Sequence, residues 1–153
     1  MTTAPPQEDV FHVVTIHHRE MDDLFEQIEH AHVVDPARAQ RLFDHLAREL
    51  MVHSRALEDV LYPRLATIAE ITPRVNRGRD EQRTALVLVD QMRALSVEDH
   101  AWVDAFHELC RLMRHHVLRE ESRIFPEARA AFDAEQLREL ARELRRAELA
   151  LTR

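Results

Sequence analysis

The sequence predicts an all-α protein, an antiparallel up-down-up-down four-helix bundle with a short additional C-terminal helix. Three observations lead to this fold class. One glycine in 153 residues cannot supply the turns with positive φ that a many-stranded sheet needs. Residues that favour helix N-termini recur at regular intervals, and apolar residues recur three and four positions apart between them. The length indicates a single domain over residues 1–153.

Four pairs of residues mark expected helix starts. In each pair an Asp, Ser or Thr that can cap a helix is followed by proline or by a second capping residue; the pairs are Asp35–Pro36, Thr72–Pro73, Ser96–Asp99 and Asp133–Gln136. We expect helices over residues of about 8–32, 37–69, 74–94, 97–130 and 134–151. Short connections favour antiparallel neighbours, so the first four form the bundle, over about 8–130. The fifth lies across its outside or one end.

Each of the first four helices has an apolar stripe at the spacing of a buried helix face. The stripes are Phe11, Val14, Met21, Phe25 and Ile28; Leu42, Leu46, Leu50, Leu57 and Leu61; Val75, Leu86 and Val89; and Phe106, Leu109, Met113 and Ile124. The fifth helix has three leucines on one side, at Leu137, Leu140 and Leu144. These stripes are the predicted core.

Polar residues interrupt every stripe of the bundle near its middle. They are His18, His53, Gln82 and the pair His116 and Glu120. The midpoints of antiparallel helices of similar length meet at one level. Four polar interruptions at one level are costly to bury unless they share a partner.

The composition excludes several classes of site. All 21 basic residues are Arg, so the chain has no lysine for a Schiff base or a P-loop. Its single cysteine, Cys110, excludes a disulfide framework and a cysteine-based metal site. The net charge of −7 argues against nucleic acid as the main partner. No export signal or membrane-length apolar stretch is visible, so we expect a cytoplasmic chain with no membrane partner.

A local pattern occurs twice, from His53 to Pro63 and from His116 to Pro126. Both copies have His, an acidic residue five positions on, an aromatic residue nine on and Pro ten on. In the second copy Glu120 also follows His116 by four positions, which puts both side chains on one helix face, about 40° apart. Both can then reach one metal ion, and each Pro is expected to bend or end its helix beyond the site.

Together these motifs resemble the hemerythrin-like (HHE cation-binding) domain family over nearly the whole chain. Residues 15–25, 53–63 and 114–126 resemble the family's motifs on its first, second and fourth helices. The resemblance implies two iron ions bridged by carboxylates and by an oxo or hydroxo group. By that resemblance the iron ligands are His18, His53 and His116, with Glu120 as a bridging carboxylate.

Two ligand positions depart from the family pattern. Leu57 stands where the family has Glu, and Gln82 stands where it has His. Leucine cannot bind a metal, and a glutamine oxygen is a neutral, weak ligand for iron. Two metal ions in a dry core need anionic ligands, so these departures weaken a two-iron site.

Three alternatives stay open for the altered site. In one, Glu58 replaces the missing carboxylate as a metal ligand. In another, a single ion is held by His18, His53 and Glu120, the ligand types of non-haem iron sites with open positions. In the third, a neighbouring polar side chain turns inward; the candidates are Glu81, Asp80 and His115.

The resemblance implies a non-haem iron protein whose partner is a small molecule such as oxygen or peroxide, with a role in oxygen, redox or iron chemistry. The expected cofactor is iron, two ions by resemblance and one or none given the departures; zinc and haem rank below it. Two other functions stay open, an oxidoreductase acting on oxygen or peroxide and a metal-free structural or interaction bundle. The sequence does not fix the oligomeric state.

Overall fold

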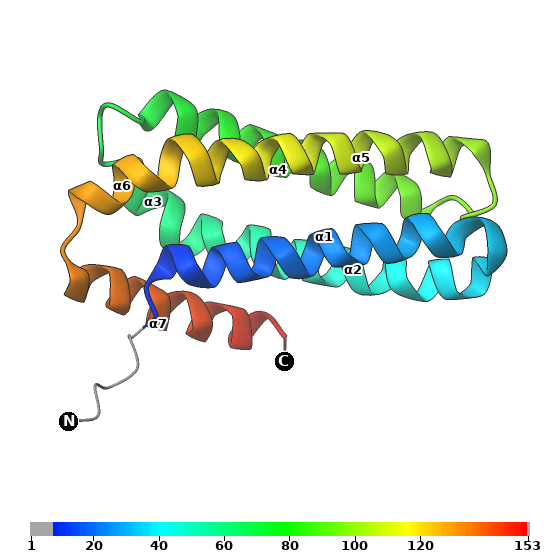
Figure 1. Ribbon diagram of the computed structural model, residues 1–153, viewed down its shortest axis with the longest axis horizontal. Helices are drawn as coiled ribbons and strands as arrows, with labels where there is room; N and C mark the ends of the chain where they lie inside the picture. Colours follow the sequence, from blue (N-terminus) through cyan, green and yellow to red (C-terminus); the bar gives the residue numbers. More distant parts are fainter. Residues whose placement is uncertain (1–7, 153) are drawn as a thin grey trace.

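The computed structural model describes residues 8–152, and every regular element in that part of the chain is helical (Figure 1). The elements in order are α1 (Val10–Val34), α2 (Pro36–Ala56), η1 (Leu57–Leu61), α3 (Tyr62–Leu65), α4 (Thr72–Arg93), α5 (His100–Arg119), η2 (Glu120–Ile124), α6 (Phe125–Ala131) and α7 (Ala134–Leu151). The long helices α1, α2, α4 and α5 lie side by side along the long axis, and α7 lies beside α1 and α2. The all-helical prediction is confirmed.

Two of the predicted helix caps are present as expected. The side chain of Asp35 accepts a hydrogen bond from the N–H of Arg38 (3.1 Å) and caps α2. Asp133 and Gln136 form a reciprocal capping box at the start of α7. Both caps satisfy backbone N–H groups that have no partner within the helix.

Two other helix starts differ from the prediction. Thr72 was expected to cap a helix but lies inside α4, where its hydroxyl donates to the carbonyl of Ile68 (2.9 Å). The helix expected from about residue 97 begins at His100. The reason is a local turn in which the N–H of Ser96 donates to the Asp99 carboxylate (2.9 Å), so that Asp99 becomes the N-cap.

The predicted second and fourth helices are each interrupted by a π-helical turn. η1 follows α2 directly, η2 follows α5 directly, and a proline stands near the start of the short helix that comes next. The N–H of Tyr62 bonds the carbonyl of Leu57, and the N–H of Phe125 bonds that of Glu120, each five residues back. Proline cannot donate to a regular helical ladder, and the wider turn absorbs the break. The repeated sequence pattern thus produces the same break twice.

Apolar side chains form two clusters, one toward each end of the bundle. The cluster nearer the α1–α2 connection contains Trp102, which stacks on Phe106 (ring centroids 5.2 Å apart) and meets Phe43 edge-on (5.6 Å). The cluster at the opposite end contains Phe11 and Phe125 (4.8 Å). It also receives one face of α7, through Leu137, Leu140 and Leu144. Each fully buried leucine contributes about 1.5–3 kcal/mol to holding α7 in place.

A polar level separates the two apolar clusters. On α1, His18 lies between Val14 of one cluster and Met21 of the other. The buried polar residues of the described chain all belong to this level; they are His18, His53, Ser54, Gln82, His116 and Glu120. The sequence prediction that the interrupted stripes meet at one level is therefore confirmed.

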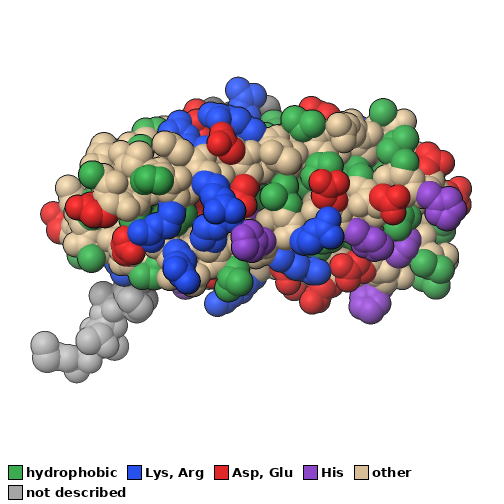
Figure 2. All heavy atoms as spheres, turned by 90° about the horizontal axis from the view of Figure 1, so that it is seen from above, with side chains coloured by type: hydrophobic (Ala, Val, Ile, Leu, Met, Phe, Trp, Pro, Cys, Tyr) green, Lys and Arg blue, Asp and Glu red, His purple; other side chains and the backbone are tan. Residues whose placement is uncertain are grey.

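The surface carries charges of both signs. On the face shown in Figure 2, Arg and acidic side chains lie next to one another, and several His side chains gather toward one end. Among residues 8–152, no helix combines the length and the apolar character needed to cross a bilayer.

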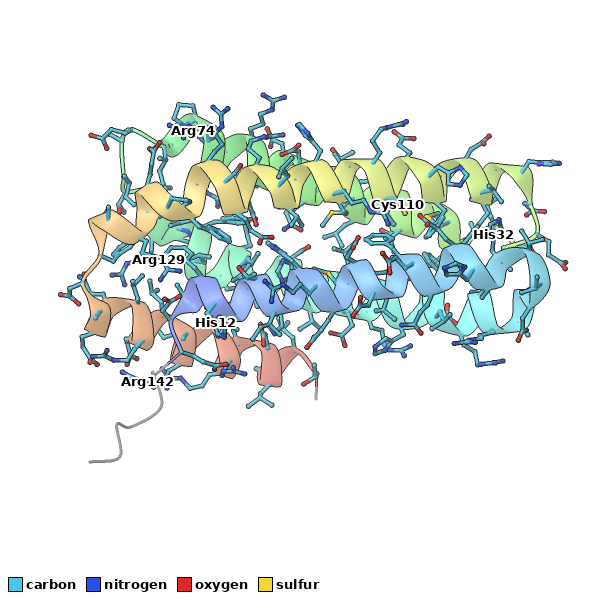
Figure 3. The ribbon with its side chains drawn as sticks, in the orientation of Figure 1. His12, His32, Arg74, Cys110, Arg129 and Arg142 are labelled. Carbon is cyan, nitrogen blue, oxygen red and sulfur yellow. The ribbon has the colours of Figure 1, made fainter. Side chains whose placement is uncertain are left out.

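Cys110 is expected to be chemically inert in the folded chain. Its side chain lies between the long helices (Figure 3), buried in the cluster around Trp102, and burial raises the pKa of the thiol from 9.0 to about 12. Because only the thiolate reacts, the reactive fraction at pH 8 falls by about a thousandfold relative to a thiol with the ordinary pKa. Iodoacetamide labelling followed by mass spectrometry should show modification in denaturant and very slow modification without it. Rapid labelling of the native chain contradicts the placement of this side chain.

Candidate metal centre

The polar level is built around the carboxylate of Glu120, the first residue of η2. The side chain is 1% exposed. Its Oε1 lies 2.9 Å from Nε2 of His116 and accepts a hydrogen bond from the hydroxyl of Tyr62 (2.5 Å). Its Oε2 lies 3.3 Å from Nε2 of His18. Side chains from α1, α3 and α5 therefore converge on one buried carboxylate.

Charge pairing keeps Glu120 ionised in spite of its burial. Burial by itself would raise the pKa of Glu120, but His116 and His18 outweigh that effect and hold the pKa well below its usual range. Burial would likewise lower the pKa of His116, but the carboxylates of Glu120 and Glu81 raise it to about 9. The pKa of Tyr62 is raised well above its ordinary value, by burial and then by the negative charge of Glu120. The centre therefore contains a carboxylate, an imidazolium and a neutral phenol.

Gln82 connects the other side of the polar level. Its Oε1 accepts a hydrogen bond from the hydroxyl of Ser54 (2.5 Å), and its Nε2 lies 3.3 Å from the hydroxyl of Tyr62 and 3.1 Å from Nε2 of His116. The amide therefore has hydrogen-bond partners from two elements, α2 and α3, while the protonated Nε2 of His116 donates to Glu120 instead. This network accounts for a neutral polar residue in the middle of α4 at a position that is 4% exposed.

Two further carboxylates hold the imidazoles from outside. Glu121 accepts from Nδ1 of His18 (3.0 Å). Glu81 lies 3.4 Å from Nδ1 of His116 and is itself held by a two-point ion pair with Arg119 (2.8 and 2.7 Å). A carboxylate on the far nitrogen fixes the orientation of an imidazole, which is the usual arrangement around histidines that bind metals.

Three buried atoms in the centre have no hydrogen-bond partner. They are Nε2 of His18, Nε2 of His53 and Oε2 of Glu120, of which Nε2 of His18 and Oε2 of Glu120 face each other at 3.3 Å as an ion pair. The ring centroids of the two histidines are 5.3 Å apart. Burial, and then the neighbouring His18, lower the pKa of His53 well below its ordinary value, so this imidazole is neutral and has a lone pair available. Two imidazole nitrogens and a carboxylate oxygen without partners are a donor set that fits one metal ion.

The donors do not surround a common point as they stand. Among residues 8–152, no group of three His, Cys, Asp or Glu side chains is arranged so that it could hold a metal ion directly. The physical reason is that Glu120 lies between the imidazoles and is directed at His116, Tyr62 and His18. Metal binding would require the carboxylate to turn from these hydrogen bonds toward the atoms that lack partners.

The structure does not bring Glu58 into the centre. On a regular helix a residue five positions after His53 lies about 140° around the axis from it, and so faces another direction. Glu58 instead pairs with Arg79 (2.5 Å) and is 38% exposed. Leu57 occupies the corresponding inner position and is completely buried among apolar residues.

The other candidates for an inward turn also lie elsewhere. Asp80 is 74% exposed and pairs with Arg83, and His115 is exposed on α5. Glu81 is closest to the centre, but it lies outside His116 and is held by Arg119. No described side chain therefore replaces the missing carboxylate.

Comparisons with known proteins agree with this arrangement. The model of the hemerythrin HHE cation-binding domain matches residues 9–128. The chain belongs to this family. The match ends before α7, which is the part of the chain that lies beside α1 and α2.

Two individual proteins resemble this HHE domain. A crystal structure of an HHE cation-binding domain-containing protein from Mycobacterium kansasii superimposes with a TM-score of 0.79 at 20% identity, over 94% of this chain and 87% of that one. A protein from Nostoc sp. strain PCC 7120 that is named a DNA nickase is 28% identical over 135 residues. Those residues are 88% of this chain but only 38% of the Nostoc protein. The structural likeness supports the fold, and the family model supports a cation-binding ancestry.

Sequence reasoning did not place three contributors to this HHE centre. Tyr62 is marked in the sequence only by its place in the repeated pattern, nine residues after His53, which does not say that its hydroxyl reaches Glu120. Ser54 carries no signal in the sequence, because a serine beside a histidine on a helix is common. The pairing of Glu81 with Arg119 joins residues 38 positions apart on different helices, and no periodicity within one helix reveals it.

Without metal, the chain is expected to lose stability between pH 6.5 and about 9. His116 binds its proton more tightly in the folded chain, where its pKa is raised from 6.5 to about 9. Its contribution is therefore complete below pH 6.5 and is lost as the pH rises through the folded value, an effect of about 3 kcal/mol. Urea unfolding in the presence of a chelator measures this directly. His116→Gln is the control, and an equally steep fall in that variant contradicts the assignment.

Proposed function

We propose that this HHE domain is a non-haem iron protein that holds a single ion between His18, His53 and Glu120 and takes oxygen or peroxide as its small-molecule ligand. The observation that carries the proposal is the set of three buried donor atoms on these residues that make no hydrogen bond. Leaving such atoms unsatisfied costs about 1–3 kcal/mol each, more for a charged group, so an ion in contact with all three explains why they are buried together. The four long helices, which we infer to be antiparallel neighbours, provide the frame.

The residues around the centre favour one ion over two. Leu57 is apolar and offers no ligand. Gln82 is neutral, and its amide is engaged with Ser54 and Tyr62. The remaining imidazole, His116, is engaged on both nitrogens by carboxylates. A second ion would need these groups to give up their partners, and it would gain only one imidazole and a neutral oxygen.

In this proposal the chain's own residues orient the donors and exclude water. When bound, iron supplies open coordination positions for a small oxygen species. Glu121 fixes the ring of His18 through Nδ1, and His116 holds Oε1 of Glu120 so that Oε2 faces Nε2 of His18. Tyr62 keeps a proton on its hydroxyl beside Oε1. The apolar clusters at the two ends of the bundle keep bulk water from reaching the polar level along the bundle axis.

A metal-free bundle is the second candidate, and one observation favours it. Gln82, Ser54 and Tyr62 satisfy one another, and the pairing of His116 with Glu120 neutralises the buried charge without an ion. Within the centre, the two Nε2 atoms and the carboxylate oxygen described above make no hydrogen bond. Metal content decides between the two candidates.

DNA cleavage is not the function that this centre supports. The HHE chain covers 38% of the Nostoc protein that is named a DNA nickase. Its net charge is −7. On the face in Figure 2, basic and acidic side chains are interspersed, whereas nucleic-acid surfaces carry clustered basic residues.

Protein purified without a histidine tag is expected to contain one iron ion per chain, as measured by inductively coupled plasma mass spectrometry. His53→Ala and Glu120→Gln each remove one donor and should lower the iron content at least about tenfold. His107→Ala removes an exposed imidazole of α5 and should leave it unchanged. Addition of peroxide should change the visible spectrum of the iron-containing protein. Two ions per chain contradict the single-ion proposal, and absence of metal in the parent chain supports the metal-free bundle.

Restoring both missing ligands should raise the iron content from one ion to two. The double variant Leu57→Glu and Gln82→His supplies a carboxylate at the first residue of η1 and an imidazole on α4. The matched control is Leu61→Glu with Gln82→His, which buries a carboxylate in the same π turn four residues further on. An unchanged iron content in a folded double variant shows that the missing ligands do not limit the number of ions.

A further inference from the structure

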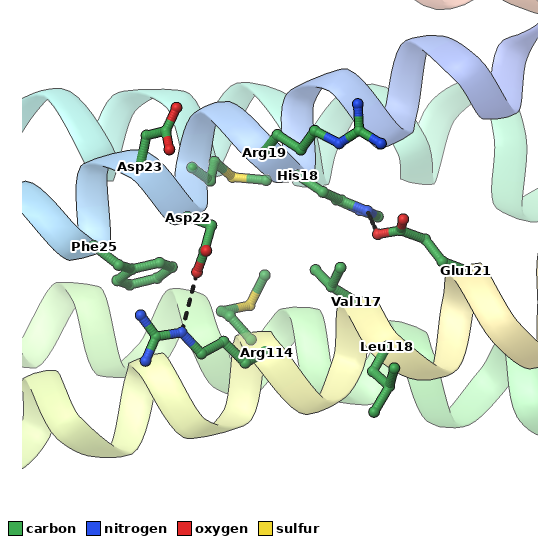
Figure 4. A pocket seen from close by; sticks show the side chains of 11 residues that line it. His18, Arg19, Asp22, Asp23, Phe25, Arg114, Val117, Leu118 and Glu121 are labelled. Carbon is green, nitrogen blue, oxygen red and sulfur yellow. Dashed lines mark hydrogen bonds and ion pairs between the residues drawn. The ribbon is translucent and has the colours of Figure 1, made fainter.

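A cavity of about 530 Å³ opens between α1 and α5 and leads to the metal centre. Figure 4 shows it from close by, with α1 on one side and α5 continuing into η2 on the other. At its inner end lies His18, which is 3% exposed. The same imidazole meets Glu120 through Nε2 and Glu121 through Nδ1. The cavity therefore connects solvent with the polar level.

The cavity has an apolar floor and a charged rim. Met21, Phe25 and Met113 form the floor and are each less than 5% exposed. On the rim, the carboxylate of Asp22 on α1 accepts from Arg114 on α5 (3.0 Å), so an ion pair crosses the seam between the two helices. The charged residues stay in contact with water, while the apolar floor is available to a ligand.

The volume of the cavity suits a small organic molecule better than oxygen or hydrogen peroxide. Pockets for small organic molecules have volumes of about 300–1,000 Å³, whereas one water molecule takes up about 30 Å³ in the liquid. Oxygen or hydrogen peroxide would fill only a small part of the 530 Å³ observed. The floor of methionine, phenylalanine and valine side chains gains most from contact with a hydrocarbon body.

The charges around the cavity disfavour an ionic ligand. The three carboxylates of the lining, Asp22, Asp23 and Glu121, outnumber its two arginines. Of these, Arg114 is already engaged by Asp22 and Glu29, and Arg19 is exposed to water, so an anion would meet a net negative lining. A cation would lose its hydration over the apolar floor. A neutral molecule with one polar oxygen avoids both costs.

We propose that this cavity binds a neutral organic molecule with an apolar body and a hydroxyl or hydroperoxide head. The body lies on Met21, Phe25 and Met113, and the head lies at the inner end beside His18 and Glu121. This inference rests on the proposed function in one respect only: a hydroperoxide is the form of the ligand that would react at the metal. Binding itself requires the cavity alone, so it can be measured whether or not metal is present.

Methionine methyl resonances test this proposal within one molecule. With carbon-13 in the methionine methyl groups, Met21 and Met113 report on the cavity, while Met51 and Met92 do not line it and serve as internal controls. The probe is cumyl alcohol, a neutral, unreactive molecule with an aromatic body and a hydroxyl head. We expect saturable shifts of Met21 and Met113 and unchanged positions for Met51 and Met92.

Two matched variants locate the binding site. Val117→Phe places a ring in the cavity and should weaken binding of the probe by at least about tenfold. Val87→Phe makes the same change at an exposed position of α4 and should leave binding unchanged. Equal shifts of all four methionines, absence of saturation, or unaltered binding to a folded Val117→Phe chain overturns the proposal.

The outcomes also separate this inference from the proposed function. Saturable probe binding to a chain that contains no metal supports the cavity and contradicts the iron proposal. One iron ion per chain together with unshifted Met21 and Met113 resonances supports the iron proposal and contradicts ligand binding in the cavity. Sodium decanoate, an anion with an apolar body, should bind at least about tenfold more weakly than the alcohol, and equal or tighter binding contradicts the preference for a neutral head.

Discussion

The buried charge of Glu120 is the constraint on which the rest of this HHE domain depends. A carboxylate that is 1% exposed is stable only with cationic or hydrogen-bonding partners, and removing one partner of a buried pair costs about 3–5 kcal/mol. Those partners come from helices far apart in the sequence, so the register of α1, α3 and α5 is set by contact with one side chain. The apolar clusters at the two ends can then pack on either side of a fixed polar level.

The buried charge of Glu120 also gives a reason why Leu57 and Gln82, the two departures from the family's ligand pattern, occur together. Without metal, the negative charge of Glu120 is balanced by the proton on His116. A second carboxylate at Leu57 would add a buried negative charge without a cation, and a second imidazole at Gln82 would compete for the partners of His116. Leucine and glutamine at these positions keep the level neutral. The centre is therefore suited to low charge, which agrees with one ion or none better than with two.

The sequence predicts those residues of the centre whose positions follow from helical periodicity. His18 and His53 interrupt apolar stripes, and those stripes fixed which way they face. Glu58 is an acidic residue five positions after His53, but helix geometry turns it toward Arg79. The π turns could not be read from periodicity, since they depend on how the backbone accommodates a proline. Contacts between helices, such as Glu81 with Arg119, depend on tertiary register and leave no trace in a single sequence.

The position of α7 gives the centre two unlike sides. α7 lies beside α1 and α2, and its Glu148 meets His17 (3.1 Å), the neighbour of a proposed ligand. The cavity on that side is about 310 Å³, and its lining includes His53, Glu49 and Arg145. Among residues 8–152, no helix covers the α1–α5 side in this way, and the cavity there is larger and has an apolar floor. The larger cavity offers a hydrocarbon body more apolar contact on the side of His18. The helix that lies beyond the family match therefore makes the two approaches to the centre differ in size and in the residues that border them.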